Sequence, residues 1–133
     1  MAQQQQSQQN AVPQISDAEW EVMKLVWQLQ PVPASDLVAR LGREQRWAPR
    51  TIKTMLARLV DKGALGYEVD GKRFLYRAKV RREACVRQES RSFLSRVFGG
   101  AVAPAVVHLL THSNLTEDEI RQLRRVLDGG GEK

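Results

Sequence analysis

Hydrophobic residues recur at helical spacing in three segments of the first half of the chain. The first segment begins at a capping box, Ser16 to Glu19, and runs to about Gln30, where two prolines follow. The second spans about Ala34 to Leu41 and is expected to stop at Gly42. The third spans Pro49 to about Lys62, with proline at its first position. The apolar positions of these predicted helices, which form the expected core, are Trp20, Met23, Val26, Trp27, Leu37, Val38, Leu41, Ile52, Leu56, Leu59 and Val60.

The period then changes from helical to alternating. Residues 65–69 and 73–77 are predicted to be two strands, and Asp70-Gly71 between them is typical of a hairpin turn. Three helices followed by a basic hairpin is the order of a winged helix. The predicted fold is therefore mainly α: a winged helix-turn-helix domain of three helices plus a β-hairpin wing.

The last third of the chain is helical again and rich in apolar positions. Helices are predicted over residues 83–98, 101–111 and 117–127, the last after a second capping box that begins at Thr116. Three helices this short cannot hide all of their apolar residues among themselves, so we expect a homodimer in which a second copy covers them. The residues expected in this C-terminal helical dimerisation region are Phe93, Leu94, Val97, Val106, Val107, Leu110, Ile120, Leu123 and Leu127, of which the last three should be buried by the final helix.

Positive charge is concentrated in two parts of the chain. The formal net charge is +6, yet residues 40–62 alone carry seven basic against two acidic side chains, and residues 72–96 carry nine against two. Such clustering is typical of nucleic-acid binders, although arginines on exposed helix faces can also serve only solubility.

Composition and the two ends of the chain set the expected organisation. A single cysteine excludes a disulfide framework, the longest apolar run (residues 101–110) is about half the length of a membrane span, and no secretion signal begins the chain. We therefore expect a cytoplasmic protein without membrane insertion. Residues 1–14, with seven glutamines, are expected to be a disordered tail, 15–79 the winged-helix DNA-binding domain, 80–128 the dimerisation region and 129–133 a flexible end.

The exposed side of the third helix carries the candidate DNA-reading residues. Arg50 or Lys53 is expected to read guanine, while Thr51 and Thr54 would meet a thymine methyl group or a phosphate. Phosphate contacts are expected from Arg58 and from the wing tip, and Arg46 and Lys62 are weaker candidates. The wing-tip candidates are Lys72 and Arg73.

Three blocks of the chain carry a family resemblance. They are Ile15-Ser-Asp-Ala-Glu-Trp-Glu-Val-Met-Lys-Leu-Val-Trp27, Arg50-Thr-Ile-Lys-Thr-Met-Leu-Ala-Arg-Leu-Val-Asp-Lys-Gly63 and Ser92-Phe-Leu-Ser-Arg-Val-Phe-Gly-Gly100. Over about residues 13–128 the chain resembles the penicillinase-repressor family, which includes β-lactamase repressors, methicillin-resistance repressors and a copper-responsive branch. The resemblance implies a cytoplasmic dimer that blocks transcription from a palindromic double-stranded operator. It also implies induction through a membrane-bound sensor metalloprotease, after which the repressor is cut in its C-terminal region.

Three positions depart from that family's pattern. The chain lacks the paired Cys-x-Cys motifs of the copper-responsive branch, so copper sensing by thiolates is excluded. His108-Leu109 stands where the β-lactamase branch has its Asn-Phe cleavage bond, which leaves cleavage at this place open. Ala48 replaces the serine cap that relatives often place before the recognition helix, a loss that costs about 0.5–2 kcal/mol in general.

Other chemistry has weaker support. His108 and His112 are four residues apart on a helix but lack further ligands, so no metal site is expected, and no cofactor or enzyme motif is present. Cys85, with arginines nearby, is an ordinary thiol or a redox switch, and the tryptophans and Tyr76 are expected to pack rather than to stack on single strands.

Two alternatives to a repressor controlled through its dimer stay open at this point. One is a winged-helix regulator that releases DNA when it binds a small ligand, which requires a pocket. The other is a winged-helix module for protein interaction that does not bind DNA. Such a module would show no salt-dependent binding to duplex DNA.

Overall fold

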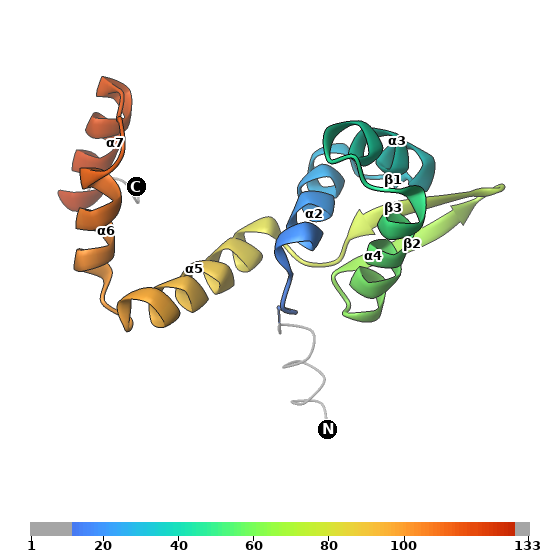
Figure 1. Ribbon diagram of the computed structural model, residues 1–133, viewed down its shortest axis with the longest axis horizontal. Coiled ribbons are helices and arrows are strands. Elements are labelled where there is room, and N and C mark those ends of the chain that lie inside the picture. Colours follow the sequence, from blue (N-terminus) through green and yellow to red (C-terminus); the bar gives the residue numbers. More distant parts are fainter. Residues whose placement is uncertain (1–11, 130–133) are drawn as a thin grey trace. The chain divides into compact units, whose positions relative to one another are not determined.

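The structure is a computed structural model that describes residues 12–129. The chain divides into two compact units, one up to Gln88 and one from Glu89 onward, and each is described by itself. Over its described residues, the first unit contains helices α2, α3 and α4, the start of α5 and a small sheet (Figure 1). Its elements are α2 (Asp17–Leu29), β1 (Val32–Pro33), α3 (Ala34–Glu44), α4 (Pro49–Asp61), β2 (Leu65–Asp70), β3 (Arg73–Ala78) and the start of α5 (Arg82–Phe98).

The three strands form one antiparallel sheet in the order β1-β3-β2. Strands β2 and β3 make the predicted hairpin, with Asp70 opposite Arg73 and Gly71 at φ +65° in the turn. The short strand β1 was not predicted, because its two residues lie among prolines that indicate only the end of a helix. Val32 pairs with Tyr76 on the open edge of β3. The predicted winged helix-turn-helix is confirmed.

Local signals at the helix ends explain where α2 and α4 begin and stop. The capping box of α2 is present: the Glu19 amide donates to Ser16 Oγ at 3.2 Å, and the Ser16 amide donates to the Glu19 carboxylate at 2.9 Å. Helix α4 starts after Ala48 with no side-chain cap, as expected, and is followed by Gly63 at φ +86°. Only glycine adopts that left-handed conformation without steric cost.

Helix α3 is longer than the sequence predicts. It runs through Gly42 to Glu44, so the prediction that Gly42 ends the helix is wrong. Glycine disfavours a helix by about 1 kcal/mol but does not forbid it. The Gln45 amide donates to the Leu41 carbonyl at 2.9 Å, which continues the helical bonding past the glycine.

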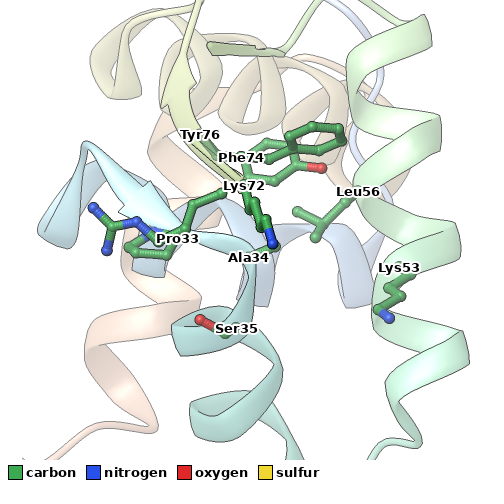
Figure 2. A pocket seen from close by; sticks show the side chains of 9 residues that line it. Pro33, Ala34, Ser35, Lys53, Leu56, Lys72, Phe74 and Tyr76 are labelled. Atoms are coloured by element: carbon green, nitrogen blue, oxygen red, sulfur yellow. The ribbon is translucent and has the colours of Figure 1, made fainter. Parts of the chain in front are cut away.

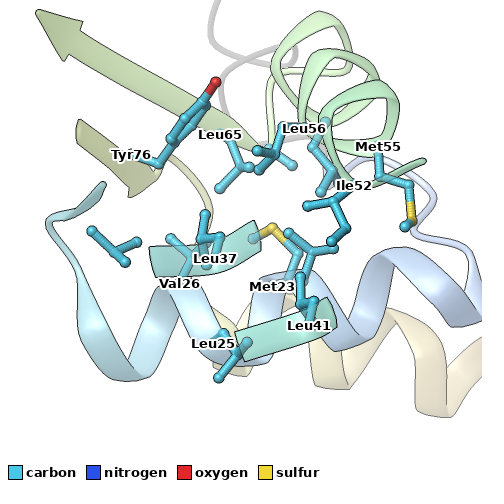
Figure 3. Close-up of a cluster of buried hydrophobic side chains, with 14 of the residues drawn as sticks. Met23, Leu25, Val26, Leu37, Leu41, Ile52, Met55, Leu56, Leu65 and Tyr76 are labelled. Atoms are coloured by element: carbon cyan, nitrogen blue, oxygen red, sulfur yellow. The ribbon is translucent and has the colours of Figure 1, made fainter. Parts of the chain in front are cut away.

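Helices α2, α3 and α4 pack around one hydrophobic core with the sheet at its edge (Figure 3). Met23, Leu37, Ile52 and Leu59 have no measurable exposure, and Tyr76 of β3 is also buried. Each such side chain contributes about 1.5–3 kcal/mol when it is fully buried. This packing fixes α3 and α4 against each other and leaves the other side of α4 in solvent.

The N-terminal segment joins this unit earlier than expected. Val12 packs against the core, the Pro13 carbonyl accepts a hydrogen bond from Gln88, and the Gln14 carbonyl accepts one from Lys62 at 2.8 Å. The prediction of a disordered tail is therefore wrong for residues 12–14, because their backbone and apolar groups find partners far along the chain. The rest of that tail, residues 1–11, and the predicted end at 130–133 lie outside the described residues.

The second unit contains the rest of α5, then α6 (Val102–Thr111) and α7 (Glu117–Leu127). Thr116 and Glu119 form the second capping box, as predicted. Ala105 is the only buried residue between Glu89 and Gly129. The prediction that α7 buries Ile120 and Leu127 is wrong for a single chain, in which both are exposed, because the unit has too few elements to cover them.

Among the described helices, none is by itself long and apolar enough to cross a membrane. Helices α5 and α6 together have the length and composition of a membrane span, but the chain bends by 89° between them.

Candidate nucleic-acid interface

Helix α4 has one apolar face and one basic face. The apolar face, which includes Ile52 and Leu59, is buried in the core. The same 3.6-residue period that turns these residues inward turns the polar ones to solvent. The exposed residues include all five that were predicted to contact DNA on this helix: Arg50, Thr51, Lys53, Thr54 and Arg58. The second helix of a helix-turn-helix places such a face in the major groove of DNA.

The cations of this face have no competing partner of their own. Within residues 12–129, Arg50, Lys53 and Arg58 form no ion pair with a carboxylate. The Thr54 hydroxyl donates to the Arg50 carbonyl at 2.9 Å, so its hydrogen is used within the helix and its methyl group is left for contact. The face is therefore ready to bind an anion without first breaking a salt bridge.

The wing tip carries one paired and one unpaired cation. Arg73 lies 3.2 Å from the Asp70 carboxylate across the turn, so part of its charge is neutralised. Lys72, next to it in the turn, forms no ion pair within the described part of the chain. Both side chains are exposed, and Lys72 is the stronger candidate for a phosphate contact.

A hollow of about 470 Å³ separates the wing from α4 (Figure 2). Lys53 and Leu56 extend toward it from α4, and Phe74 and Tyr76 come from β3. The nine residues that line it are Pro33, Ala34, Ser35, Lys53, Leu56, Lys72, Arg73, Phe74 and Tyr76. Predicted DNA-contacting residues of the helix and of the wing thus share one concave surface.

Comparison with known proteins agrees with this geometry. The penicillinase repressor family model matches residues 15–129. The chain belongs to this family. It is 36% identical over 117 residues to the penicillinase repressor of Bacillus licheniformis, an alignment that covers 88% of this chain and 91% of that one. It is 31% identical over 119 residues to the methicillin resistance regulatory protein MecI of Staphylococcus aureus strain N315, covering 90% and 97%.

Solved structures of a penicillinase repressor match the first unit's architecture. The solution structure of the DNA-binding domain of the repressor BlaI is 39% identical, with a TM-score of 0.52, and covers 56% of this chain and 90% of that one. The Bacillus licheniformis BlaI monomer in complex with the blaP half-operator matches with 39% identity and a TM-score of 0.51. In both matches the amino-acid sequence is similar as well as the fold, so they support the family assignment and not the fold alone.

Two candidate contacts of this penicillinase repressor family member have other surroundings than the sequence suggests. Lys62 donates to the buried carboxylate of Glu19 and to the Gln14 carbonyl, so its ammonium group already has partners within the fold, and its contact with DNA stays a prediction. Arg46 is exposed in the turn between α3 and α4, where its backbone is left-handed at φ +59°. A non-glycine residue in that conformation is uncommon and marks a tightly constrained turn.

The predicted dimerisation residues are spread over the second unit's surface. Leu94, Leu110 and Leu123 are half-buried. The others are exposed: Phe93, Val97, Val106, Val107, Ile120 and Leu127. His108 and Leu109, the predicted cleavage position, are exposed within helix α6. A protease that cuts there would have to unwind the helix locally.

The cysteine, the tryptophans and the two histidines were the other candidates for chemistry or stacking. Cys85 is buried, and that burial raises the pKa of its thiol, which favours the ordinary thiol over the redox switch. Trp20 and Trp27 pack against the core, and the Trp27 indole donates to the Val80 carbonyl at 3.0 Å. The rings of His108 and His112 are 4.5 Å apart, and no three potential metal ligands gather anywhere in residues 12–129.

Two features of the site were missed by sequence reasoning. Glu19 is 3% exposed, although the sequence indicates only a capping residue at the surface. Its partner Lys62 is 43 positions away, so no local pattern in the sequence indicates the ion pair. The aromatic face of the hairpin could have been found, because the alternation of a strand places Phe74 and Tyr76 on one face of β3. In the structure Tyr67 lies opposite Tyr76, and Val69 opposite Phe74.

Proposed function

We propose that this penicillinase repressor family member is a DNA-binding transcriptional repressor that acts as a homodimer on a palindromic operator. The observation that carries the proposal is the exposed basic face of α4, whose cations Arg50, Lys53 and Arg58 have no acidic partner within residues 12–129. Its relatives are named as repressors and regulatory proteins rather than enzymes.

Each part of the DNA-binding unit has a role in this proposal. Arg50 and Lys53 read base edges in the major groove, where an arginine or lysine pairs with guanine O6 and N7. The methyl groups of Thr51 and Thr54 meet thymine or lie beside the backbone. Arg58 and the wing cations bind phosphates and fix the orientation of the helix.

The exposed apolar residues of the second unit support a dimer. Val97, Val107 and Leu127 are 59%, 62% and 77% exposed in one chain, and large apolar patches of this kind mark interaction surfaces. A two-fold dimer would present two α4 helices to two half-sites, which is the symmetry that a palindromic operator requires.

Control of the repressor follows from the same arrangement. We infer a cytoplasmic repressor of a β-lactamase-type or related resistance operon that is released when its dimer contacts are lost. A membrane-bound sensor metalloprotease is the partner that the family resemblance suggests. The exposed position of His108 and Leu109 on α6 supports cleavage near that bond, which would remove α7 from the rest of the unit.

Footprinting tests the proposal. The purified full-length protein is titrated onto the DNA upstream of its own gene, and two protected half-sites about one helical turn or a multiple apart are expected. Protection without two-fold symmetry would contradict the dimer on a palindrome. Absence of any protected site, with duplex binding independent of salt concentration, would favour a module for protein interaction instead.

A further inference from the structure

The hollow between the wing and α4 has an apolar floor and a cationic rim. Phe74 and the half-buried Pro33 provide exposed apolar surface beside the buried side chains of Tyr76 and Leu56, and Lys53 and Lys72 extend from opposite elements (Figure 2). None of the residues that line it is acidic. Since Lys53 and Lys72 have no ion pair within residues 12–129, the hollow carries uncompensated positive charge.

The size of the hollow suits a small organic molecule. Its volume of about 470 Å³ lies within the range of roughly 300–1,000 Å³ that is usual for ligand sites. A ligand that is only a phosphate group would bind to the two lysines and make no use of the apolar floor. Because an apolar floor lies beside the two lysines, the hollow favours a ligand that also has a flat apolar body.

The aromatic part of the floor is held in place before any ligand binds. Phe74 stacks on Tyr67 with ring centroids 4.8 Å apart and an interplanar angle of 23°, and Tyr67 also contacts Tyr76 at 5.7 Å. Antiparallel pairing of β2 and β3 fixes the three rings on one face of the hairpin. Phe74 is nevertheless 45% exposed, so one part of its ring is available for contact. A rigid, exposed aromatic surface costs little conformational entropy when it binds.

We propose that this hollow is an effector site for a small organic anion with a flat apolar body, of the chemical class of the aromatic carboxylates. The apolar body packs on Phe74 between β3 and α4, and the carboxylate pairs with Lys72 and Lys53. Because Lys53 is also assigned to the operator, the bound anion competes with DNA. Only this last step rests on the proposed repressor function.

Binding is tested on the full-length protein without DNA. Naphthalene-2-carboxylate is titrated into the ¹⁵N-labelled protein, with naphthalene-2-methanol as the neutral probe of the same shape. We expect saturable shifts of the amide signals of residues 34–35, 53–56 and 72–76 with the carboxylate, and affinity for the alcohol that is weaker by about tenfold, as expected for a lost charge-assisted bond. Equal binding of both probes, or shifts confined to the second unit's apolar residues, would overturn the proposal.

Variants locate the site. Phe74→Ala and Lys72→Gln should each weaken carboxylate binding by about fivefold or more. Val69→Ala in β2 and Lys79→Gln just after β3 change exposed residues that do not line the hollow, and should leave carboxylate binding unchanged. If Phe74→Ala is without effect and inorganic phosphate displaces naphthalene-2-carboxylate with an affinity equal to that of the carboxylate, the hollow holds only a phosphate group and the proposal is wrong.

Competition is tested separately with the footprinted operator. Naphthalene-2-carboxylate at a concentration close to its dissociation constant for the wild type should lower the operator affinity of the wild-type protein more than that of Lys72→Gln. If the probe binds but operator affinity is unchanged, the effector role is wrong. If the protein binds no operator at all, the repressor function fails, while the binding experiment without DNA still decides whether the site exists.

Discussion

The ammonium group of Lys62, at the end of α4, donates to the buried carboxylate of Glu19 near the start of α2. The two residues are 43 positions apart, and Glu19 also closes the capping box of its own helix through the Ser16 amide. Lys62 donates in addition to the Gln14 carbonyl. One ion pair therefore fastens the N-terminal segment and the end of the candidate recognition helix to the same point.

Substitution of Lys62 should lower stability without a specific loss of DNA recognition. Lys62→Met leaves the Glu19 carboxylate buried without its cation, and we expect the free energy of unfolding to fall by about 1–3 kcal/mol. Urea unfolding measures this change. Lys24→Met, which breaks the exposed pair with Glu21 on α2, is the control and should cost no more than about 1 kcal/mol. Equal losses of unfolding free energy in the two variants would show that the Glu19 pair stabilises the fold no more than an exposed ion pair does.

The same pair predicts an acid dependence of stability. Burial on its own would raise the pKa of Glu19, but the hydrogen bonds from Lys62 and the Ser16 backbone, together with the Lys62 charge, hold that pKa below its ordinary value. A carboxyl group whose pKa is lower in the folded chain stabilises it above the unfolded pKa of about 4.3 and loses that effect as the pH falls through the folded pKa.

Glu19→Gln should therefore flatten the stability profile in acid. Between neutral pH and the region below about pH 4.3, the wild-type free energy of unfolding should fall more than that of the variant. Glu21→Gln, a change on the same helix, should keep the wild-type profile. Parallel profiles for wild type and Glu19→Gln, measured by denaturant unfolding at each pH, would contradict the assigned role of Glu19.

Much of the fold could be predicted from the sequence because its signals are local. The capping boxes at Ser16 and Thr116, Pro49 at the start of α4 and the alternating residues of the hairpin all act within a few positions. Strand β1, the burial of Glu19 and the hydrogen bonds of Pro13 and Gln14 could not be predicted, since each depends on partners more than 40 positions away that leave no periodic pattern. For the site, the helical period alone placed Arg50 and Lys53 on one face, whereas the hollow required the hairpin's position relative to α4.

Two glycines should respond in opposite directions to the same substitution. Gly42 lies inside α3, where an added Cβ would meet only the Trp47 carbonyl at 3.8 Å, so Gly42→Ala should stabilise the protein by about 0.5–1 kcal/mol. Gly63 ends α4 at φ +86°, so Gly63→Ala should destabilise it by about 1–2 kcal/mol. Thermal unfolding of both variants checks the signs, and a stabilising Gly63→Ala would contradict the described end of α4.

A charge in the exposed apolar surface of the second unit should weaken the dimer but leave each chain folded. Val107 is 62% exposed in the single chain, so Val107→Asp places a carboxylate in water in the monomer and in an apolar interface in the dimer. We expect the dimer dissociation constant to rise by more than about tenfold in sedimentation equilibrium. Ser113→Asp, after the end of α6, is the control. A wild-type protein that is monomeric at high concentration would contradict the dimer.

The central claim is that the exposed face of α4 recognises DNA, and operator binding measured by fluorescence anisotropy tests it most directly. The footprinted operator and a scrambled duplex of equal composition are titrated with the wild type, Arg50→Ala, Lys53→Ala and the control Lys24→Ala from the solvent side of α2. The account predicts that Arg50→Ala or Lys53→Ala loses about 1–3 kcal/mol on the operator and little on the scrambled duplex, while Lys24→Ala matches the wild type. Operator affinity that is the same in all four proteins, or no preference of the wild type for operator over scrambled DNA, would contradict it.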